Sequence, residues 1–296
     1  MSKAHRAAAF AVDVMCRVAG RRNVVRAARF ALYRAGIDFG YNMQLNGEFA
    51  LQGWILDLLP RGQVVHVLDV GANVGGWSRP FLDLAESRGR LDDVDLHAFE
   101  PCAATFRQLA KALGDSPASL QQLAVSDRPG KATLHIAPGD SSVNSLHPIP
   151  GWHNATEHVS ATTLDAYAQQ AGLTRIDLLK IDAEGHDLAV LKGASDLLRN
   201  ARITVIQFEY NHCWIPPRYF LYDTFCLLEP LGYRLGKLTP LGVEFYPSWN
   251  SDLETFRGAN YVACRKDVAE RFPQVPERHR VAAVLETKYL EPGFSM

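Results

Sequence analysis

The sequence predicts an α/β protein whose central sheet is mostly parallel, with an antiparallel C-terminal edge and a cap of helices at the N-terminus. From residue 63 onward, apolar strand patterns alternate with helical patterns, which is typical of a parallel sheet covered by helices on both faces. The run at 64–70 is almost unbroken in apolar residues, as expected for a buried parallel strand. Three short strand patterns between residues 234 and 265 follow without a helix among them, which indicates an antiparallel edge.

The composition is that of a globular protein and argues against several functional classes. The 296 residues are 47% hydrophobic and 21% charged, which suits one large domain with a small appendage. With 31 basic and 32 acidic residues, the chain lacks the basic surplus of a dedicated nucleic-acid-binding protein. Its five cysteines form no C-x-x-C pair, so we expect neither a disulfide framework nor a thiolate zinc site. We expect the protein to work in a reducing compartment, the cytoplasm. We also expect no membrane-spanning helix and no signal peptide.

Residues 1–60 are expected to form the helical cap. Three helices are predicted. The first spans about 4–19, the second begins after an N-cap at Asn23 and ends at Gly36, and the third spans about 47–59. The last of these has apolar residues at i, i+3, i+4 and i+7, as an amphipathic helix does.

The first 35 residues contain eight basic side chains and one acid, Asp13. One interpretation is a basic amphipathic hairpin that contacts an anionic membrane, with Phe10, Val14 and Val18 on one helical face. The other, which we favour, is a helical cap with a solvated outer face. The sequence does not determine the oligomeric state, and a homo-oligomer is compatible with it.

The main domain is predicted to span residues 61–266, with an inserted substrate loop at 127–160 and a charged tail at 267–296. The insertion is rich in Pro, Gly, Ser and His and has one strand pattern, at 131–136. The expected strands of the sheet are 64–70, 94–100, 120–125, 176–182, 203–209, 234–238, 242–246 and 261–265. The expected helices are 77–87, 102–113, 163–170, 187–198 and 219–230.

The first strand runs into a glycine-rich turn, DVGANVGG at 69–76. Gly71 and Gly75 let the backbone turn tightly and let a ligand approach it closely. Such turns bind dinucleotides, phosphates and S-adenosylmethionine alike. However, an acid at Asp69 would repel a pyrophosphate about 5 Å away by about 3 kcal/mol at an effective dielectric constant near 20. It suits a ligand whose nearby end carries an ammonium and a sulfonium, and Asn73 replaces the middle glycine of the dinucleotide pattern.

Glu100 ends the second strand, where a carboxylate can accept hydrogen bonds from both hydroxyls of a ribose. The alternative is an exposed acid at a strand end before Pro101. Together, the turn and this acid predict a binding site for S-adenosylmethionine.

The motifs that follow these two features resemble those of the FkbM-type methyltransferases. The matching segments, in order, are DVGANVG at 69–75, FEP at 99–101, AVSD at 124–127, TLD at 163–165, KIDAEGHD at 180–187, VLKGA at 190–194, FE at 208–209 and NYVA at 260–263. The resemblance covers about residues 64–265, and the stretch 180–194 is its most specific part. Family members usually carry Glu where this chain has Asp187.

The resemblance implies a Rossmann-like, seven-stranded class I methyltransferase sheet and methyl transfer from S-adenosylmethionine, usually to a hydroxyl oxygen. By position, Gly71, Asn73 and Gly75 would line the methionine end of the cofactor, near Asp69. Glu100 would hold the ribose. The segment ending at Ser126 would border the adenine.

Acidic and imidazole side chains follow two strands that are neighbours in this fold. Asp182 ends the fourth strand, with Glu184 and His186 after it, and Glu209 ends the fifth, with Asn211 after it. Because adjacent strands lie about 4.8 Å apart, Asp182 and Glu209 can face the same space. Their repulsion could be offset by a cation, a shared proton or a basic partner such as Lys180.

Two mechanisms are compatible with this edge of the sheet. In the first, which we favour slightly, Asp182, Glu209 or His186 accepts the acceptor's proton. In the second, Mg²⁺ held by Asp182, Glu209 and either Asn211 or Glu184 lowers the pKa of the hydroxyl.

The acceptor is expected to be a small molecule or an oligosaccharide with a free hydroxyl. Trp152 of the insertion could stack on a sugar, and Tyr210, Trp214 and Tyr219 could form the opposite wall. The predicted function is O-methylation of a saccharide, glycolipid or other secondary metabolite. The alternatives are N-methylation of a small molecule and a non-catalytic module that binds S-adenosylmethionine.

Overall fold

The computed structural model describes residues 3–34, 42–276 and 279–280. The chain forms two compact units, Met1–Phe39 and Gly40–Met296. The expected end of the second helix at Gly36, and residues 281–296 of the expected tail, lie outside the described residues. Within the described ranges, no helix combines the length and apolar character needed to cross a bilayer.

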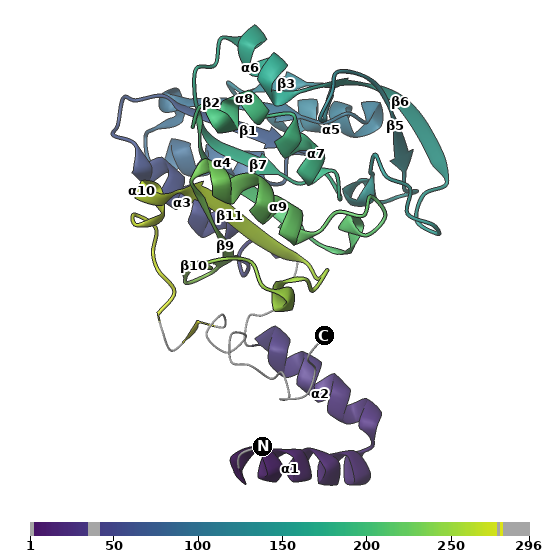
Figure 1. The fold of residues 1–296 in the computed structure, drawn as a ribbon. Coiled ribbons are helices and arrows are strands. Elements are labelled where there is room, and N and C mark those ends of the chain that lie inside the picture. The colour runs from purple at the N-terminus through teal and green to yellow at the C-terminus, as the bar shows by residue number, and fades with distance from the viewer. Residues whose placement is uncertain (1–2, 35–41, 277–278, 281–296) are drawn as a thin grey trace. The chain divides into compact units, whose positions relative to one another are not determined.

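The smaller unit contains two helices, α1 (Lys3–Ala19) and α2 (Arg21–Arg34), as the sequence predicts. The start of α2 differs from the prediction, because Asn23 lies inside the helix and not at its N-cap. The Asn23 Nδ2 group donates to the carbonyl oxygen of Ala19 at 2.9 Å. The turn between the helices is made by Gly20, whose φ is +81°, and Figure 1 shows the two helices diverging from it.

The larger unit is built on an eight-stranded sheet with the order β10-β9-β11-β8-β7-β1-β2-β3. Strands β3, β2, β1, β7 and β8 pair in parallel, and β11, β9 and β10 add an antiparallel edge. This confirms the predicted fold class, with eight strands where the family resemblance implied seven. The bounds are β1 Val65–Val70, β2 Val94–Phe99, β3 Ser119–Gln121, β7 Ile176–Ile181, β8 Ile203–Tyr210, β9 Tyr233–Thr239, β10 Gly242–Phe245 and β11 Ala259–Arg265.

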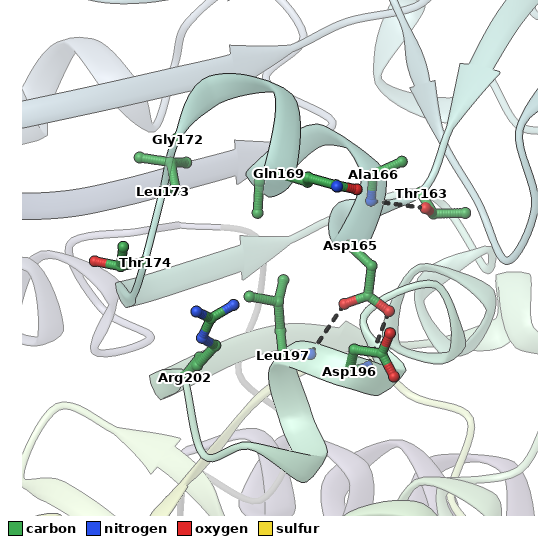
Figure 2. A pocket seen from close by; sticks show the side chains of 11 residues that line it. Thr163, Asp165, Ala166, Gln169, Gly172, Leu173, Thr174, Asp196, Leu197 and Arg202 are labelled. Atoms are coloured by element: carbon green, nitrogen blue, oxygen red, sulfur yellow. Dashed lines mark hydrogen bonds between the residues drawn. The ribbon is translucent and has the colours of Figure 1, made fainter.

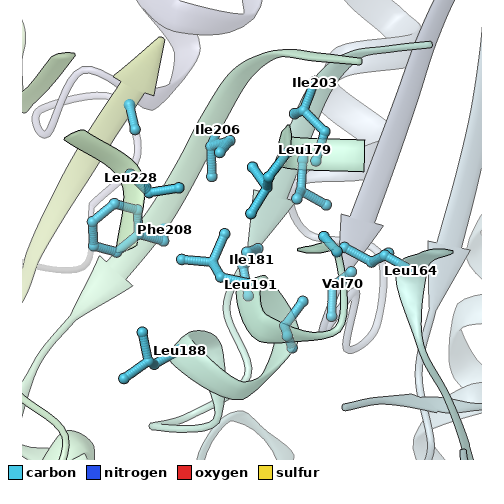
Figure 3. Packing of buried hydrophobic residues seen from close by; sticks show 14 of the residues in the cluster. Val70, Leu164, Leu179, Ile181, Leu188, Leu191, Ile203, Ile206, Phe208 and Leu228 are labelled. Atoms are coloured by element: carbon cyan, nitrogen blue, oxygen red, sulfur yellow. The ribbon is translucent and has the colours of Figure 1, made fainter. Parts of the chain in front are cut away.

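Helices cover both faces of this sheet (Figure 1). One face packs against α3 (Glu48–Leu58), α4 (Ser78–Ser87), α5 (Ala103–Leu113) and α10 (Lys266–Ala269). The other packs against α6 (Leu164–Ala171), α7 (Asp187–Lys192), α8 (Ser195–Arg199) and α9 (Leu221–Leu228). Figure 3 shows part of the second layer, where Ile181 and Phe208 of the sheet meet Leu188 and Leu191 of α7. Helix α3, which we grouped with the N-terminal cap, buries Leu51 and Ile55 in the core of the larger unit.

The remaining strands form a separate three-stranded sheet with the order β4-β6-β5, drawn beside α5 in Figure 1. Its strands are β4 (Ala124–Val125), β5 (Gly130–Ile136) and β6 (Ala155–Thr162). The strand that we predicted at 120–125 is therefore wrong as a single element, because β3 ends in the main sheet and β4 lies in the small one. Strand β6 was missed, since its sequence is polar and Val159 is its one buried side chain.

Short 3₁₀ helices complete the described elements. They are η1 (Leu91–Asp93), η2 (Ser141–Val143), η3 (His212–Trp214), η4 (Glu229–Leu231) and η5 (Ser251–Leu253).

Candidate functional site

The glycine-rich turn lies at the carboxyl end of β1, between the ends of β2 and β7. The N–H groups of Gly71 and Ala72 both donate to the carbonyl oxygen of Phe99, at 3.0 and 2.9 Å. Gly71 has a φ of +78°, and a Cβ atom there would lie 1.9 Å from the carbonyl oxygen of Asp182. Gly75 and Asn73 also have positive φ values, +90° and +48°. The turn is therefore fixed against the strand end that carries the predicted catalytic acid.

Asp69 is fully buried beneath this turn, on the sheet face that α3 and α4 cover. It lies in register with Lys180 of β7, whose Nζ atom is 3.1 Å from Asp69 Oδ1 and 3.5 Å from Asp182 Oδ2. Ser78 donates to Asp69 Oδ2 at 2.6 Å. Burial lowers the pKa of Lys180, but Asp69, Asp182 and Glu48 raise it by more, so the ammonium form is retained. The charge of Asp69 is balanced inside the fold, and its expected contact with a cofactor remains a prediction.

Glu100 follows β2 and is held by the backbone. Its Oε2 atom accepts from the N–H of Asn73 at 3.1 Å, and its Oε1 atom accepts from the N–H of Cys102 at 2.9 Å. Burial raises the pKa of Glu100 to about 7, although these two N–H groups oppose the shift. Glu100 thus borders the glycine-rich turn, and its contact with a ribose remains a prediction.

Asp182, Glu184 and Glu209 come together at the carboxyl ends of β7 and β8. One carboxylate oxygen from each lies within 4.8 Å of the others. Burial and the charge of Asp182 raise the pKa of Glu184 to about 8 and that of Glu209 well above its usual value. For Glu209 the causes, after burial, are the charges of Asp182 and Glu184. Of the offsetting devices that the sequence allowed, the geometry shows the basic partner Lys180, whose Nζ atom lies 3.5 Å from Asp182 Oδ2.

Two residues place Glu184 in this cluster. Glu184 has a φ of +47° and the following Gly185 a φ of +89°, so the chain turns sharply after β7. A Cβ at Gly185 would lie 2.0 Å from the carbonyl oxygen of Cys213, which follows β8. This close approach requires glycine and brings the ends of the two strands together.

Asn211 is arranged differently from the expected metal ligand. Its Oδ1 atom accepts from the N–H of Cys213 at 2.7 Å and so begins η3. Its Nδ2 group donates to Glu209 Oε2 at 2.8 Å. The amide oxygen of Asn211 thus accepts a backbone hydrogen bond, and its NH₂ group orients Glu209. The third carboxylate oxygen near Asp182 and Glu209 comes from Glu184.

His186 and Ser126 form a chain of hydrogen bonds with the insertion. His186 Nε2 is 2.9 Å from Ser126 Oγ, and His186 Nδ1 is 2.9 Å from Nε2 of His147. Burial, followed by the neighbouring His147, lowers the pKa of His186 to about 4, and burial also lowers the pKa of His147. Both rings are thus neutral near pH 7, and both nitrogens of His186 have partners.

The insertion also contacts the glycine-rich turn and the cluster of Asp182, Glu184 and Glu209. Ser141 Oγ donates to Asn73 Oδ1 at 2.8 Å, and Ser145 Oγ donates to the carbonyl oxygen of Glu184 at 2.7 Å. Contacts of this kind could not be read from the sequence, because they join residues 39 to 68 positions apart.

The aromatic wall that we expected after β8 is largely wrong. Tyr210 and Trp214 are fully buried in the core, where Tyr210 donates to Glu254 and Trp214 donates to the carbonyl oxygen of Glu209. Tyr219 is half-buried, with its ring 6.0 Å from that of His147.

Trp152 is the aromatic side chain of the insertion that remains available to an acceptor. It is 40% exposed, and its ring lies 5.0 Å from that of His212.

A hollow of about 630 Å³ lies elsewhere, between α6 and α8, and none of the predicted site residues lines it (Figure 2). Asp165 accepts there from the N–H groups of Asp196 and Leu197, at 2.9 and 3.0 Å. The acid of the TLD motif therefore caps the start of α8.

Comparison with known proteins identifies the family. The family model for the methyltransferase FkbM domain matches residues 69–235. A 2-O-methyltransferase, NoeI of Sinorhizobium fredii, is 27% identical over 53% of this chain and 67% of its own length. A hexuronic acid methyltransferase, AglP of Haloferax volcanii, is 22% identical over 51% of this chain and 57% of its own length.

Among solved structures, a TehB-like methyltransferase from Corynebacterium glutamicum is 14% identical, with a TM-score of 0.36 over 83% of this chain and 97% of that one. A likeness of this degree adds nothing to the family match.

Proposed function

Because this chain belongs to the FkbM family of S-adenosylmethionine-dependent methyltransferases, we propose that it methylates a hydroxyl oxygen of a saccharide. The observation that carries the proposal is the cluster of Asp182, Glu184 and Glu209 beside the glycine-rich turn. It supplies carboxylates that can take a hydroxyl proton next to a site suited to the methyl donor.

The residues of the turn fit the donor. Gly71, Asn73 and Gly75 provide the bend, and Glu100 lies beside it with a carboxylate already oriented by two backbone N–H groups. When bound, S-adenosylmethionine supplies an electrophilic methyl carbon on a positively charged sulfur. Asp69, whose charge is paired with Lys180, would lie beneath the methionine end of the donor, and Ser126 would border the adenine.

The carboxylates of Asp182 and Glu209 are the proposed bases. One of these two carboxylates would accept the proton that the acceptor hydroxyl loses when its oxygen is methylated. A carboxyl group whose pKa is raised by burial is a stronger base once deprotonated, and Glu209 meets this condition. His186, which we also predicted as catalytic, has both nitrogens engaged and acts in this proposal as a positioning residue.

Two observations support a saccharide acceptor. The half-exposed ring of Trp152 can stack on sugar C–H groups. The two relatives carry names that specify 2-O-methylation and a hexuronic acid substrate. N-methylation is the alternative, but an amine has a free lone pair and has less need of the carboxylate cluster.

Mg²⁺ is a second possibility for the same cluster. The donor set fits a hard cation, because Asp182, Glu184 and Glu209 offer only oxygens, and the buried Asp182 Oδ1 has no hydrogen-bond partner among the described residues. These three residues would hold the ion, which would lower the pKa of the acceptor hydroxyl.

The proposal is tested with a panel of sugars and amines and a labelled methyl donor. We expect label on hydroxyl acceptors, and turnover of Asp182→Asn and Glu209→Gln lower by about 10²–10⁴-fold, the usual contribution of a general base. Affinity for S-adenosylhomocysteine should stay within a few-fold. Glu86→Gln, a matched change at an exposed acid of α4, should leave turnover unchanged.

Label on amines alone would reject O-methylation, and full turnover of both variants would remove the two acids from the mechanism. The same assay in chelator with Mg²⁺ add-back decides between the mechanisms. Full activity in chelator rejects the metal.

A further inference from the structure

The two N-terminal helices expose apolar side chains along their length. Phe10 and Val18 of α1 are 68% and 84% exposed, and Phe30 of α2 is 65% exposed. Between residues 6 and 32, every side chain is exposed except those of Cys16 and Val24, which are half-buried. Helices of this length are marginal in water unless an amphipathic face is covered. The exposed apolar side chains therefore indicate a surface that binds something.

The apolar side chains form stripes. On α1, Phe10, Val14 and Val18 are spaced four residues apart and share one face. On α2, Val25 and Leu32 lie two turns apart on one face and are 45% and 37% exposed. Each helix thus presents a continuous apolar stripe to solvent.

Positive charge surrounds these stripes. Arg6 lies one turn before Phe10, and Arg17 lies one turn after Val14. Residues 1–35 hold eight of the 31 basic residues of the chain but only one of its 32 acidic residues. Arginine and lysine can lay their apolar stems on such a stripe while their charged ends reach outward.

We propose that α1 and α2 bind the surface of an anionic lipid bilayer, with the apolar stripes inserted among the headgroups. A bilayer of this kind offers both required chemistries at once, phosphates for the arginines and an apolar interior for Phe10 and Val18. A second copy of the chain fits less well, because it would bring the same excess of positive charge to the contact. The inference does not depend on the identity of the methyl acceptor.

The test is co-sedimentation of the full chain with vesicles of phosphatidylcholine, with and without 30% phosphatidylglycerol. We expect at least ten-fold tighter binding to the anionic vesicles, weakened by raised salt because exposed charges are screened. Phe10→Ser with Val18→Ser, and separately Arg22→Glu with Arg26→Glu, should each reduce binding about ten-fold. Arg107→Glu with Lys111→Glu makes the same charge change at the same spacing on the exposed side of α5 and should leave binding within two-fold.

Equal binding to neutral and anionic vesicles, or equal losses in the α2 and α5 charge variants, would overturn the proposal. So would binding to neither vesicle. If light scattering shows that Phe10→Ser with Val18→Ser dissociates an oligomer while vesicle binding is unchanged, the stripes join copies of the chain and the proposal is wrong. An unchanged melting temperature of each variant confirms that the larger unit remains folded.

Discussion

At the scale of single residues, Gly71 brings the glycine-rich turn against the strand end that carries Asp182. Its φ of +78° is a conformation that residues with a Cβ rarely adopt. In addition, a Cβ there would overlap the backbone oxygen of Asp182, which belongs to the adjacent strand end and has little freedom to move. Gly71 is therefore needed for both its backbone conformation and its lack of a side chain.

We expect Gly71→Ala to lower the free energy of unfolding by about 2–5 kcal/mol, from backbone strain together with overpacking. Gly139→Ala is the matched control, since Gly139 has a φ of +77° but a Cβ there would meet no neighbouring atom within 4 Å. It should cost only about 1 kcal/mol, the backbone part. Urea unfolding of both variants measures the difference, and equal losses would show that the close approach to Asp182 does not matter.

The residues of the site could be predicted where strand register determines them. Asp182 and Glu209 were expected to meet because they end adjacent parallel strands, and they do. The role of Glu184 was left open, since its position depends on a positive φ that the sequence does not reveal. Trp214 was misplaced because an aromatic residue after a strand end can turn into the core as easily as into a site.

At the scale of elements, the loop of the insertion that joins β5 to β6 contacts both the glycine-rich turn and the segment that follows β7. Ser141 contacts the cofactor turn at Asn73, and His147 contacts His186. These two contacts hold one loop against the proposed donor site and against the loop that follows β7. The insertion is thus positioned to order the acceptor region.

We expect His147→Ala to increase amide hydrogen exchange in residues 141–153 by roughly three- to ten-fold, the equivalent of one net hydrogen bond. His158→Ala is the control, because His158 belongs to the same insertion but is exposed on β6. Its exchange pattern should match that of the unmodified protein. If both variants behave alike, the His147–His186 hydrogen bond does not hold the loop.

The main sheet could be predicted because its strands are strongly apolar and alternate along the sequence with helical patterns. The sequence offered Thr162 or Thr163 as the cap of the helix that ends near residue 170, and it is Thr163 that accepts from the N–H of Ala166 at the start of α6. The small sheet could not be predicted, because the residues of β6 are mostly polar and exposed and only Val159 among them is buried. Val159 is buried against Leu134 of β5 and against Cys102 and Ala124, which lie far from it in the sequence, so periodicity in a single segment does not reveal its burial.

At the scale of the whole molecule, the site gathers carboxyl groups whose pKa values are raised in the folded state. Burial raises the pKa of Glu100 from 4.5 to about 7, and burial followed by the charge of Asp182 raises that of Asp187 from 3.8 to about 7. Between the ordinary and the raised pKa, the folded protein binds more protons than the unfolded chain. These carboxyl groups therefore contribute stability that is fully present below about pH 4 and is lost as the pH rises toward 8. The lowered pKa of His186 opposes part of this loss up to about pH 6.5.

We expect the free energy of unfolding of the cofactor-free protein to fall by a few kcal/mol between pH 5 and pH 8. Glu100→Gln should flatten this profile by on the order of 2 kcal/mol, since the amide does not titrate. Glu86→Gln, at an exposed site, should leave the profile as it is. Denaturant unfolding across this pH range provides the measurement, and an unaltered slope in Glu100→Gln would contradict the assignment.

The pairing of Ile136 with Ala155 closes residues 137–154 into a loop whose two ends are already tied together. Exchanging such a loop costs little chain entropy, because the neighbouring strands fix its span whatever its length. Chimeras that carry the corresponding loop of a relative should therefore fold on this scaffold. In evolution, changes in this loop could alter the methyl acceptor while the residues proposed to bind the methyl donor stay the same.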